Sequence, residues 1–464
     1  MSMTLDFTRR EHSIRFIQRD DSGTALRLFI PDSFAKEFDY KEGDTVTIRA
    51  GKWEKELQLM PVKDLPALCF GIHSSLFPFP QLLSTDTPFR LERYLKHEWR
   101  IGPVVGLLVN DAGSSPLSFG ALSGFAEEMA RHAAERNTLF FVYPFNQIWT
   151  PAGGSGFFRD GVSWITTDTP LPDVIYNRLS TASKEQSDAG KSLFSLLKQN
   201  HVPYFNERFI YKWEMHELLA RHEHLHPFLP ETVLASDRDG VLNMTRKHGQ
   251  LYIKPVRGRE GNGIIRLTCE PEGLCAEYPS DSGREPRIFR TFDKFYEALR
   301  PRLKKKPYLV QQGIPLFTVD DGLTDIRVLT VKNEAGEWQA VSKVARCGVK
   351  DQIVSNVAKG GEQRNAADVL TETFSEPYAF HLARLLNELA VEIASAIDSE
   401  LGNTGVFGEF GIDIGISADG RPWILEVNTK PSKSADPFHD QTASVRPSVK
   451  TLIAFSRCLS GVFD

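Results

Sequence analysis

The sequence predicts a mixed α/β fold made of three consecutive parts. Short strands separated by turn residues fill the first part, strands and helices alternate in the second, and a larger block of strands accompanies one long helix in the third. Alternating strands and helices are typical of open α/β sheets, whereas the other two patterns indicate a small β domain and an α+β module. We expect these domains at residues 1–62, 65–204 and 205–464.

Length and charge agree with this division and limit the partners. The 464 residues suit about three domains, at roughly 150 residues each. With 55 lysines and arginines against 60 aspartates and glutamates, the net charge of −5 gives no electrostatic footprint for duplex nucleic acid or an anionic membrane. The composition leaves the oligomeric state open.

The start of the chain and the cysteines indicate a cytoplasmic location. Residues 1–15 carry charges but no apolar signal-peptide core, and the longest apolar stretch, near 101–109, is far shorter than the ~20 residues that span a bilayer. Five scattered cysteines without the spacing of a zinc site fit a reducing interior. We therefore expect a soluble protein with neither a nucleic acid nor a membrane as partner.

The first part is expected to be a small β domain, compatible with a barrel. Turn-forming runs such as 20–23 and 41–44 separate its apolar segments. In the second part, a buried-strand pattern precedes an amphipathic helix and further strands, and a glycine cluster at 153–156 predicts a flexible loop. The expected strands are 13–17, 25–30, 45–49, 57–60, 104–109, 138–142 and 174–176, and the expected helices are 122–134 and 191–197.

The third part combines strands with helices. A helix is expected at 212–222, and apolar residues at 3.6-residue spacing predict one long helix. The residues of that spacing are Leu382, Leu385, Leu386, Leu389, Ile393 and Ile397. The expected strands are 251–254, 308–312, 325–331, 338–344, 406–416 and 423–428.

The last two of these strands form the most informative motif. Asp419-Gly420 between two apolar runs predicts a two-residue hairpin turn. Counting outward from that turn places Asp413 directly opposite Glu426, at a Cβ separation of roughly 4.5–5.5 Å. Asn428 shares their face of the sheet, because side chains repeat every two residues along a strand. The opposite, apolar face is formed by Phe410, Ile412, Ile414 and Ile416.

The polar face of this hairpin predicts a metal site. The carboxylates of Asp413 and Glu426 repel one another unless a cation lies near them, and Asn428 adds an amide oxygen. Hard oxygen ligands suit Mg²⁺ (or Mn²⁺), which takes one or two carboxylates and completes its shell with phosphate oxygens and water. The alternative is an exposed polar face with two separated acids. The apolar character of the opposite face favours the metal site.

A second motif predicts a phosphate site. Strand residue Lys254 precedes a turn that contains Gly258, Gly261 and Gly263. Glycines let backbone N–H groups approach phosphate oxygens, and the lysine supplies a positive charge. The spacing is that of neither a Walker A loop nor a dinucleotide-binding fingerprint. A plain hairpin loop is the alternative, and the presence of the acidic hairpin in the same chain favours the phosphate site.

Together these motifs carry a family resemblance. A strand-borne lysine, a glycine-rich loop, the pair Gln311-Gln312 and an Asp…Glu-x-Asn hairpin resemble the ATP-grasp fold, here preceded by an open α/β domain and a small β domain. Residues 205–435 are similar to the ligase that adds glutamate to a ribosomal protein and, more distantly, to D-alanine–D-alanine ligase. The whole chain most resembles the YheC/YheD group, endospore coat-associated proteins of spore-forming Firmicutes.

The resemblance implies roles for individual residues. It places Lys212 and Lys254 at the nucleotide phosphates and Gln311 and Gln312 against adenine, although the family usually has Gln-Glu at that position. The loop also departs from the family, because Arg259-Glu260 replace small residues. The other implied residues are Asp325 and Arg327 at the nucleotide, Arg346 and Asn356 near the reacting phosphate, and Asp413, Glu426 and Asn428 as metal ligands.

The activity implied by the resemblance is Mg²⁺-ATP-dependent ligation of a carboxylate to an amine through an acyl phosphate, connected with sporulation or the spore coat. A peptide or protein acceptor follows by analogy only. A phosphotransferase on the same scaffold and a spore-coat structural protein with a retained ATP site are the alternatives. Substrate contacts are expected from loops 351–364 and 430–440 and from the central domain.

One further motif formally matches a zinc signature. Residues 222–226 contain H-E-x-x-H, the helical pattern of metalloproteases. Pro227 follows at once and Pro230 soon after, so a helix must end there. The sequence therefore favours a solvated helix end over a zinc site.

Overall fold

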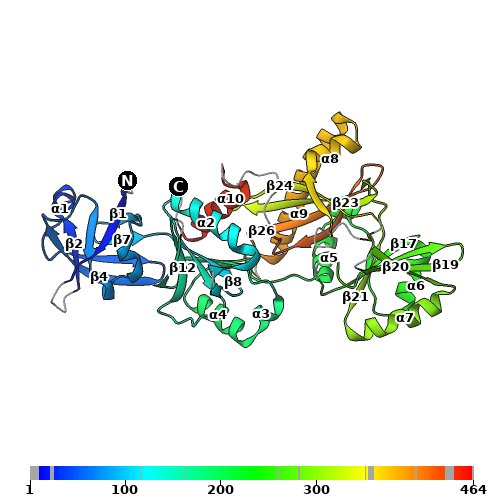
Figure 1. Ribbon diagram of the computed structural model, residues 1–464, viewed down its shortest axis with the longest axis horizontal. Coiled ribbons are helices and arrows are strands. Elements are labelled where there is room, and N and C mark those ends of the chain that lie inside the picture. Colours follow the sequence, from blue (N-terminus) through cyan, green and yellow to red (C-terminus); the bar gives the residue numbers. More distant parts are fainter. Residues whose placement is uncertain are drawn as a thin grey trace, which may run out of the picture.

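A computed structural model describes residues 10–20, 26–114, 117–161, 163–258, 261–280, 283–350, 352–353, 360–402, 405–433 and 444–461. Figure 1 shows three parts in a row, with a β domain at one end, an α/β domain in the centre and a larger module at the other end. The predicted mixed α/β class is confirmed. None of the helices in the described ranges combines the length and apolarity needed to cross a bilayer.

The N-terminal domain is a closed barrel with the strand order β1-β5-β2-β4-β3-β7-β6. The strands are β1 (Arg10–Gln18), β2 (Arg27–Pro31), β3 (Thr45–Ala50), β4 (Trp53–Val62), β5 (Cys69–Ile72), β6 (Phe89–Leu95) and β7 (Glu98–Ile101), with helix α1 (Asp32–Glu37) after β2. The predicted domain end at residue 62 is wrong, because β5, β6 and β7 are needed to close the barrel and remove its open edges.

The central domain is an open sheet with the order β13-β12-β11-β8-β14-β15. Strands β15, β14, β8 and β11 run parallel, whereas β12 and β13 are antiparallel additions at the edge. The strands are β8 (Val104–Val109), β11 (Leu139–Pro144), β12 (Gly154–Asp160), β13 (Ser163–Thr169), β14 (Val174–Asn177) and β15 (Tyr204–Phe205). The short strands β9 (Gly113–Ser114) and β10 (Leu117–Ser118) and helices α2 (Ser123–Glu135), α3 (Ala182–Gln186) and α4 (Asp188–Gln199) complete the domain.

The glycine cluster at 153–156 is not the flexible loop that the sequence predicted. Residues from Gly154 onward form strand β12, which pairs with β11 and β13. Gly156 lies against the buried ring of Tyr143, where a Cβ atom would come within 2.9 Å of a ring carbon. The glycine is therefore required by the packing of an aromatic ring rather than by a turn.

The third part is built from two sheets. The first has the order β16-β21-β17-β18-β19-β20 and the second has the order β25-β24-β23-β26-β27. The first sheet contains β16 (Thr232–Leu234), β17 (Gln250–Pro255), β18 (Ile265–Glu270), β19 (Gly273–Ser280), β20 (Gly283–Phe289) and β21 (Tyr308–Gln312), with α6 (Arg238–Lys247) and α7 (Phe292–Lys305). The second contains β23 (Gly322–Lys332), β24 (Trp338–Cys347), β25 (Glu362–Asn365), β26 (Glu409–Ile416) and β27 (Pro422–Asn428), with β22 (Thr318–Val319) beside β23.

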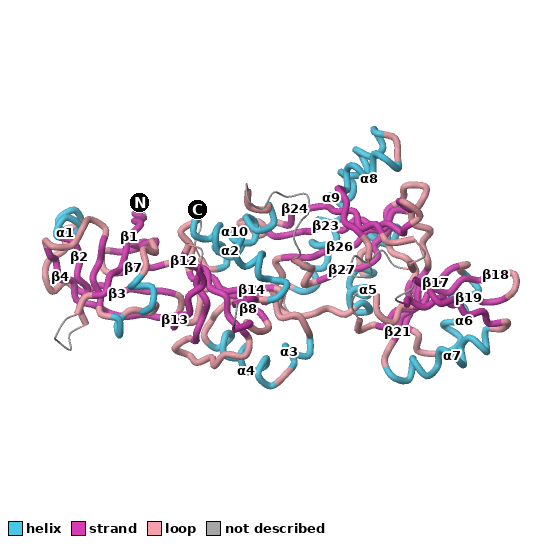
Figure 2. The backbone as a smooth tube through the Cα atoms, viewed as in Figure 1, coloured by secondary structure: helices cyan, strands magenta, loops and turns pink. Residues whose placement is uncertain are grey.

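Helices connect and cover these sheets. The predicted long helix is α9 (Glu376–Leu401), which packs beside β23 and β24 together with α8 (Ala366–Thr373). Its leucine and isoleucine stripe is buried, except that Leu385 is 37% exposed and lies off the stripe. Helix α5 (Lys212–Ala220) lies between the two sheets in Figure 2, and α10 (Pro447–Leu459) is the last helix described.

The C-terminal helix returns to the central domain. Val449, Leu452 and Phe455 of α10 share one hydrophobic core with Phe125 and Met129 of α2. Figure 1 shows α10 beside α2. Helix α10 therefore packs both against α2 of the central domain and against strands β23 and β24 of its own module, with Val331 in the same core.

The barrel is fixed to the central domain through its β3–β4 turn. The Lys52 backbone N–H donates to the Leu171 carbonyl at 2.8 Å, and Arg100 forms an ion pair with the buried Asp173 at 2.9 Å. Gly51, at φ +55°, lies so close to the segment between β13 and β14 that a Cβ atom would stand 2.2 Å from the Leu171 oxygen. The junction thus depends on the absence of a side chain at Gly51.

We predict that Gly51→Ala destabilises the protein more than Gly43→Ala. Gly43 has a similar positive φ of +87°, but its Cβ would meet no described atom within 4 Å. The conformational cost should be about 1–2 kcal/mol at both sites, and the overlap at Gly51 should add about 1–3 kcal/mol. Urea unfolding followed by tryptophan fluorescence measures both variants. Equal losses would contradict a tight junction.

Candidate active site

The acidic hairpin of β26 and β27 has the pairing that the sequence predicted, although it forms differently. Asp413 lies directly opposite Glu426. The turn has three residues, 418–420, because the Ser417 N–H donates to the Arg421 carbonyl at 2.9 Å and Gly420 adopts φ +86°. The predicted two-residue turn is therefore wrong. A bulge restores the expected pairing, since Ile414 pairs with Ile424 and leaves Leu425 as the extra residue.

The two faces of the hairpin also follow the prediction. The Asn428 amide nitrogen lies 3.4 Å from an Asp413 carboxylate oxygen, so both side chains share one face. The opposite face lies fully buried in the core beneath α9. Its residues are Phe410, Ile412, Ile414 and Ile416.

Two arginines neutralise Asp413. Arg327 of β23 is its direct cross-strand neighbour and forms a two-pronged ion pair with it. Arg346 of β24 forms an ion pair with the same carboxylate at 2.8 Å. It also donates two hydrogen bonds to the Asp325 carboxylate, at 2.7 and 2.8 Å. Burial alone would raise the pKa of Asp413, but Arg327 and Arg346 hold the pKa below its ordinary value. The three strands thus carry a ladder of alternating charges.

Lys212 neutralises Glu426 from the other side. Helix α5 begins at Lys212, and its ammonium lies 2.7 Å from a Glu426 carboxylate oxygen and 3.2 Å from the Gly258 carbonyl. Gly258 belongs to the loop after β17, whereas Glu426 belongs to β27. Lys212 therefore connects the glycine-rich loop of the first sheet to the acidic hairpin of the second.

Lys254 and Gln311 lie on the neighbouring strands β17 and β21 of the first sheet, where that sheet faces the acidic hairpin. The Lys254 ammonium donates to the Gln311 side-chain oxygen at 2.6 Å, and the Gln311 amide donates to Thr232 Oγ1 at 3.0 Å. Lys254 is partly buried. Burial lowers its pKa to about 8, although the nearby Glu426 opposes the change. Lys254 forms no ion pair with a carboxylate of the described residues, so its charge is suited to an anion that arrives from outside.

These side chains line one pocket between the two sheets. Its polar end carries Lys212, Lys254 and Glu426, and Gln311 lies along its floor. Apolar side chains from α5, β21 and β27 form the remaining wall. They are Met215, Leu219, Leu229, Leu309, Ile424, Leu425 and Val427, with His216 and Thr232 beside them. A charged end joined to an apolar slot suits a ligand with a phosphate tail and a flat ring.

The remaining predicted site residues fall into three groups. Gln312 lies outside the pocket, where its side-chain oxygen accepts from the Glu231 backbone N–H at 3.2 Å, because successive residues of β21 face opposite sides. The predicted adenine contact of Gln312 stays a prediction. Gly261 and Gly263 adopt positive φ in the loop between β17 and β18. Asn356 and Arg259-Glu260 lie outside the described residues.

The H-E-x-x-H segment does not form a zinc site in the structure. Residues Glu223–Phe228 form a 3₁₀ helix containing Pro227. His222 and His224 pair with Glu400 and Glu392 of α9, and His226 contacts the Ala220 carbonyl. Across the described ranges, no group of three or more histidine, cysteine, aspartate or glutamate residues is arranged to hold a metal. The predicted hairpin set is not such a group, because its third member, Asn428, is an amide.

Sequence reasoning missed the apolar wall of the pocket. Met215 and Leu219 have the spacing of a helix face, and Leu309 lies in a strand with a continuous apolar run. Such patterns are the same for a core residue and for the wall of a ligand slot. The bulge at Leu425 left no sequence signal, since it depends on the length of the turn.

Comparison with known proteins agrees with this arrangement. A profile described as YheC/D like ATP-grasp matches residues 201–459, more than half of the chain. The chain belongs to the YheC/D-like ATP-grasp family. The resemblance that the motifs indicated is thereby confirmed, and with it the ATP-grasp fold of the two-sheet module.

The chain is similar to two proteins of Bacillus subtilis (strain 168). It is 27% identical to the endospore coat-associated protein YheD over 348 residues, which are 73% of this chain and 74% of YheD. It is 26% identical to the endospore coat-associated protein YheC over 315 residues, 67% of this chain and 85% of YheC. D-alanyl-alanine synthetase A from Vibrio cholerae is a similar solved structure at 12% identity and a TM-score of 0.44, covering 78% of this chain and 98% of the synthetase.

We predict that nucleotide affinity without metal weakens above pH 8. Phosphate oxygens favour the protonated form of Lys254, which is already populated below its pKa of about 8. Above that pH the free protein must take up a proton to bind, so the affinity should fall about tenfold per pH unit. Titration of ATP in EDTA from pH 7 to 10 measures this slope.

Lys254→Arg provides the matched control for this pH dependence. An arginine stays charged over the whole range, so its variant should bind with little change between pH 7 and 10. The same slope in Lys254→Arg and in the parent protein would show that another group controls the affinity.

Proposed function

We propose that this chain is a Mg²⁺-ATP-dependent ligase that joins a carboxylate to an amine through an acyl phosphate. The observation that carries the proposal is the pocket between the two sheets, in which Lys212 and Lys254 lie beside Glu426 at the end of an apolar slot. Membership of the ATP-grasp family supports the same activity.

The pocket divides into a place for a ring and a place for phosphates. The slot between Met215, Leu219 and Leu309 offers an apolar surface to adenine, and Gln311 supplies hydrogen-bonding groups at its edge. The ammonium groups of Lys212 and Lys254, together with the positive-φ glycines after β17, face the phosphate end.

The hairpin residues fit a divalent metal. Asp413 and Glu426 are cross-strand partners, and Asn428 lies within 3.4 Å of Asp413. Carboxylate and amide oxygens are the ligands that Mg²⁺ takes, with phosphate oxygens completing its shell. These three residues would hold Mg²⁺, which supplies charge neutralisation at the phosphates. Mg²⁺ binding requires that some of the ion pairs that Arg327, Arg346 and Lys212 form with the two carboxylates break. The phosphates of the nucleotide would then accept hydrogen bonds from these cations.

The chemistry that the residues support is mainly positioning and charge balance. A substrate carboxylate oxygen attacks the γ-phosphorus while the bond to the β–γ bridging oxygen breaks and ADP leaves. The amine nitrogen then attacks the acyl carbon, phosphate leaves with the bonding electrons, and the nitrogen gives a proton to solvent. Burial would lower the pKa of Arg346, but Asp325 and Asp413 outweigh it and raise the pKa, so this cation persists through both steps.

The biological setting is a further part of the proposal. Two relatives carry names that associate them with the endospore coat. We propose that this ligase acts during sporulation or on the spore coat, with a peptide or protein as the acceptor. The reaction itself needs no nucleic acid or membrane.

Incubation with Mg²⁺-ATP and a sporulating-cell extract, followed by mass spectrometry, tests the proposed reaction. ADP together with a new amide supports ligation. ADP with a stable phosphorylated product would instead identify a phosphotransferase, and the absence of ADP would favour a structural role.

We predict that Lys254→Ala and Glu426→Ala each lose Mg²⁺-ATP affinity. Loss of a charged hydrogen bond costs about 1.5–3 kcal/mol, which corresponds to a roughly 10- to 100-fold weaker affinity. Isothermal titration calorimetry measures the affinity. Lys332→Ala is a matched control, because Lys332 is a mostly buried lysine that pairs with Asp398 outside the pocket. Unchanged affinity in the two site variants would contradict the assignment.

We also predict that Mg²⁺ alone binds weakly. The metal must displace Arg327 and Arg346 from Asp413, and Lys212 from Glu426, without phosphates to receive these cations. Mg²⁺ should therefore raise the melting temperature only when ATP is present. Without nucleotide, Arg327→Gln should lower several-fold the Mg²⁺ concentration that raises the melting temperature. Arg364→Gln, which removes an exposed pair with Glu372, should not change this concentration. Equal effects would show that the ion pairs do not oppose the metal.

A further inference from the structure

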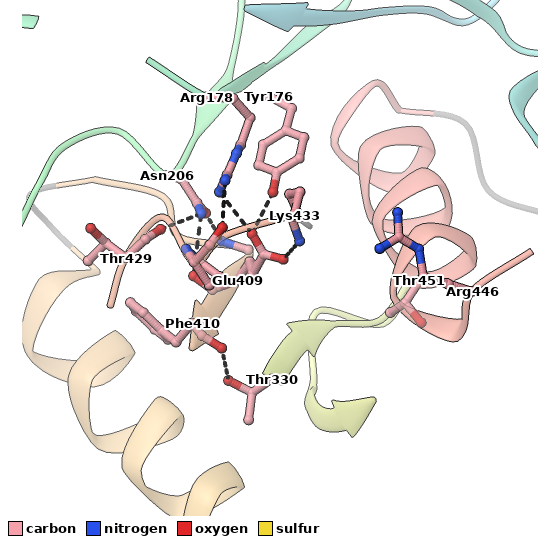
Figure 3. Close-up of polar contacts among 12 residues, drawn as sticks. Tyr176, Arg178, Asn206, Thr330, Glu409, Phe410, Thr429, Lys433, Arg446 and Thr451 are labelled. Carbon is pink, nitrogen blue, oxygen red and sulfur yellow. Dashed lines mark hydrogen bonds and ion pairs between the residues drawn. The ribbon is translucent and has the colours of Figure 1, made fainter. Parts of the chain in front are cut away.

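The segment that follows the metal-ligand hairpin is held by the central domain rather than by its own module. Figure 3 shows Thr429 and Lys433 of this segment beside Arg178 and Asn206. Asn206, next to the end of central strand β15, donates to the Thr429 carbonyl at 2.7 Å. Arg178, next to the end of β14, donates to the Pro431 carbonyl at 2.6 Å. Both donors are buried.

The side chains of the segment are held in the same way. Lys430 forms an ion pair with Glu185 of α3, and the side chains of both residues are less than a tenth exposed. Lys433 pairs with Glu409 of β26, which is fully buried and also accepts from the Tyr176 hydroxyl and from Arg178. Glu409 thus ties β26 to the central strand β14 (Figure 3). The interdomain clamp is defined here as Arg178, Glu185, Asn206 and Glu409 together with the segment 429–433.

The clamp also presses the segment onto strand β26. Gly411, the cross-strand partner of Asn428, lies under the Pro431 ring, and a Cβ atom there would stand 2.6 Å from the Pro431 Cβ. The hydrogen bond from Arg178 to the Pro431 carbonyl fixes Pro431 in this position. Asn428 is therefore fixed on one side by the sheet and on the other by a segment anchored in the central domain.

The clamp differs from the rest of the same boundary. Arg457 of α10 also crosses it, donating to the Arg136 carbonyl at 2.6 Å and to Thr138 at 2.9 Å. Arg457 is as deeply buried as Arg178, but these contacts lie at the end of α2, remote in the chain from the hairpin. A boundary that only held the domains together would need no contact on Thr429, the residue next to the proposed metal ligand Asn428.

We propose that the central domain positions the metal ligands through the interdomain clamp, with Arg178, Asn206 and Glu185 as positioning residues for Asn428. The inference rests on the proposed function, since it assigns Asn428 to the metal. Hydrogen-bonded neighbours of metal ligands typically contribute about 10- to 100-fold to metal affinity. The central domain is thereby part of the metal site, in addition to any contact that it makes with a substrate.

Arg178→Lys tests the clamp, with Arg457→Lys as its matched control. Lysine keeps the charge beside Glu409 but cannot reproduce both hydrogen bonds of the guanidinium. We expect the ratio of ATP affinities with Mg²⁺ and with EDTA to fall at least about tenfold in Arg178→Lys and to stay within about twofold in Arg457→Lys. The ATP affinity in EDTA should be the same in both variants.

A second test changes the packing of the same segment against strand β26, with a control variant of its own. Gly411→Ala should displace Pro431 and lower the Mg²⁺-dependent ratio, as Arg178→Lys does. The control is Gly71→Ala in barrel strand β5, because its Cβ would meet only the Arg19 and Phe29 side chains, in another domain from the hairpin. It should leave the ratio unchanged. This pair also decides the question if Arg178→Lys fails to fold.

Amide hydrogen exchange without any ligand gives a readout independent of nucleotide binding. Arg178→Lys and Gly411→Ala should increase exchange over 427–433, and the two controls should not. A parent protein without Mg²⁺-dependent ATP binding would overturn the proposed function together with this inference. A parent that binds, with Arg178→Lys and Gly411→Ala that retain the full Mg²⁺-dependent ratio, would overturn the inference alone.

Discussion

The candidate site depends on the balance of buried charge at the junction of the two sheets. Asp325, Asp413 and Glu426 would repel one another, and each is matched by a cation from a neighbouring element. A buried carboxylate without a partner costs several kcal/mol, so the buried Asp325 and Asp413 must form their pairs when the second sheet folds. Because each charge needs a partner, a ligand of the same charge can take the place of an internal one. Phosphates and a divalent metal can replace the internal pairs charge for charge, since they bring both signs together.

The strand order of the second sheet creates this balance. Arg346, Asp325 and Asp413 lie on three neighbouring strands, β24, β23 and β26, and they meet because cross-strand partners face the same side. Lys254 comes from the first sheet, and Lys212 comes from α5, which packs against β27 and α9. The pocket therefore lies where the two sheets bring opposite charges together, and neither sheet alone contains it.

Local pattern predicted the hairpin but not its surroundings. The period of two along β26 and β27 was enough to pair Asp413 with Glu426, since the longer turn and the bulge at Leu425 cancel in the register. The arginine partners of Asp413 could not be predicted, because strand order is a long-range property. The end of the barrel was missed for the same reason, as β5 to β7 close a sheet begun by β1. Lys430 and Lys433 look like solvated lysines in the sequence, and only the fold reveals their buried partners.

The bulge at Leu425 does more than correct the register. Ile424 and Val427 both enter the core beneath α9, although they are three residues apart and a regular strand would send them to opposite faces. The extra residue resolves this conflict and leaves Leu425 and Glu426 together on the polar face. Leu425 then extends the apolar wall of the pocket beside the carboxylate. Gly415 provides the space, because a side chain there would collide with Leu425. A single inserted residue thus puts an apolar surface next to Glu426, the proposed metal ligand, which is the combination that the proposed nucleotide site requires.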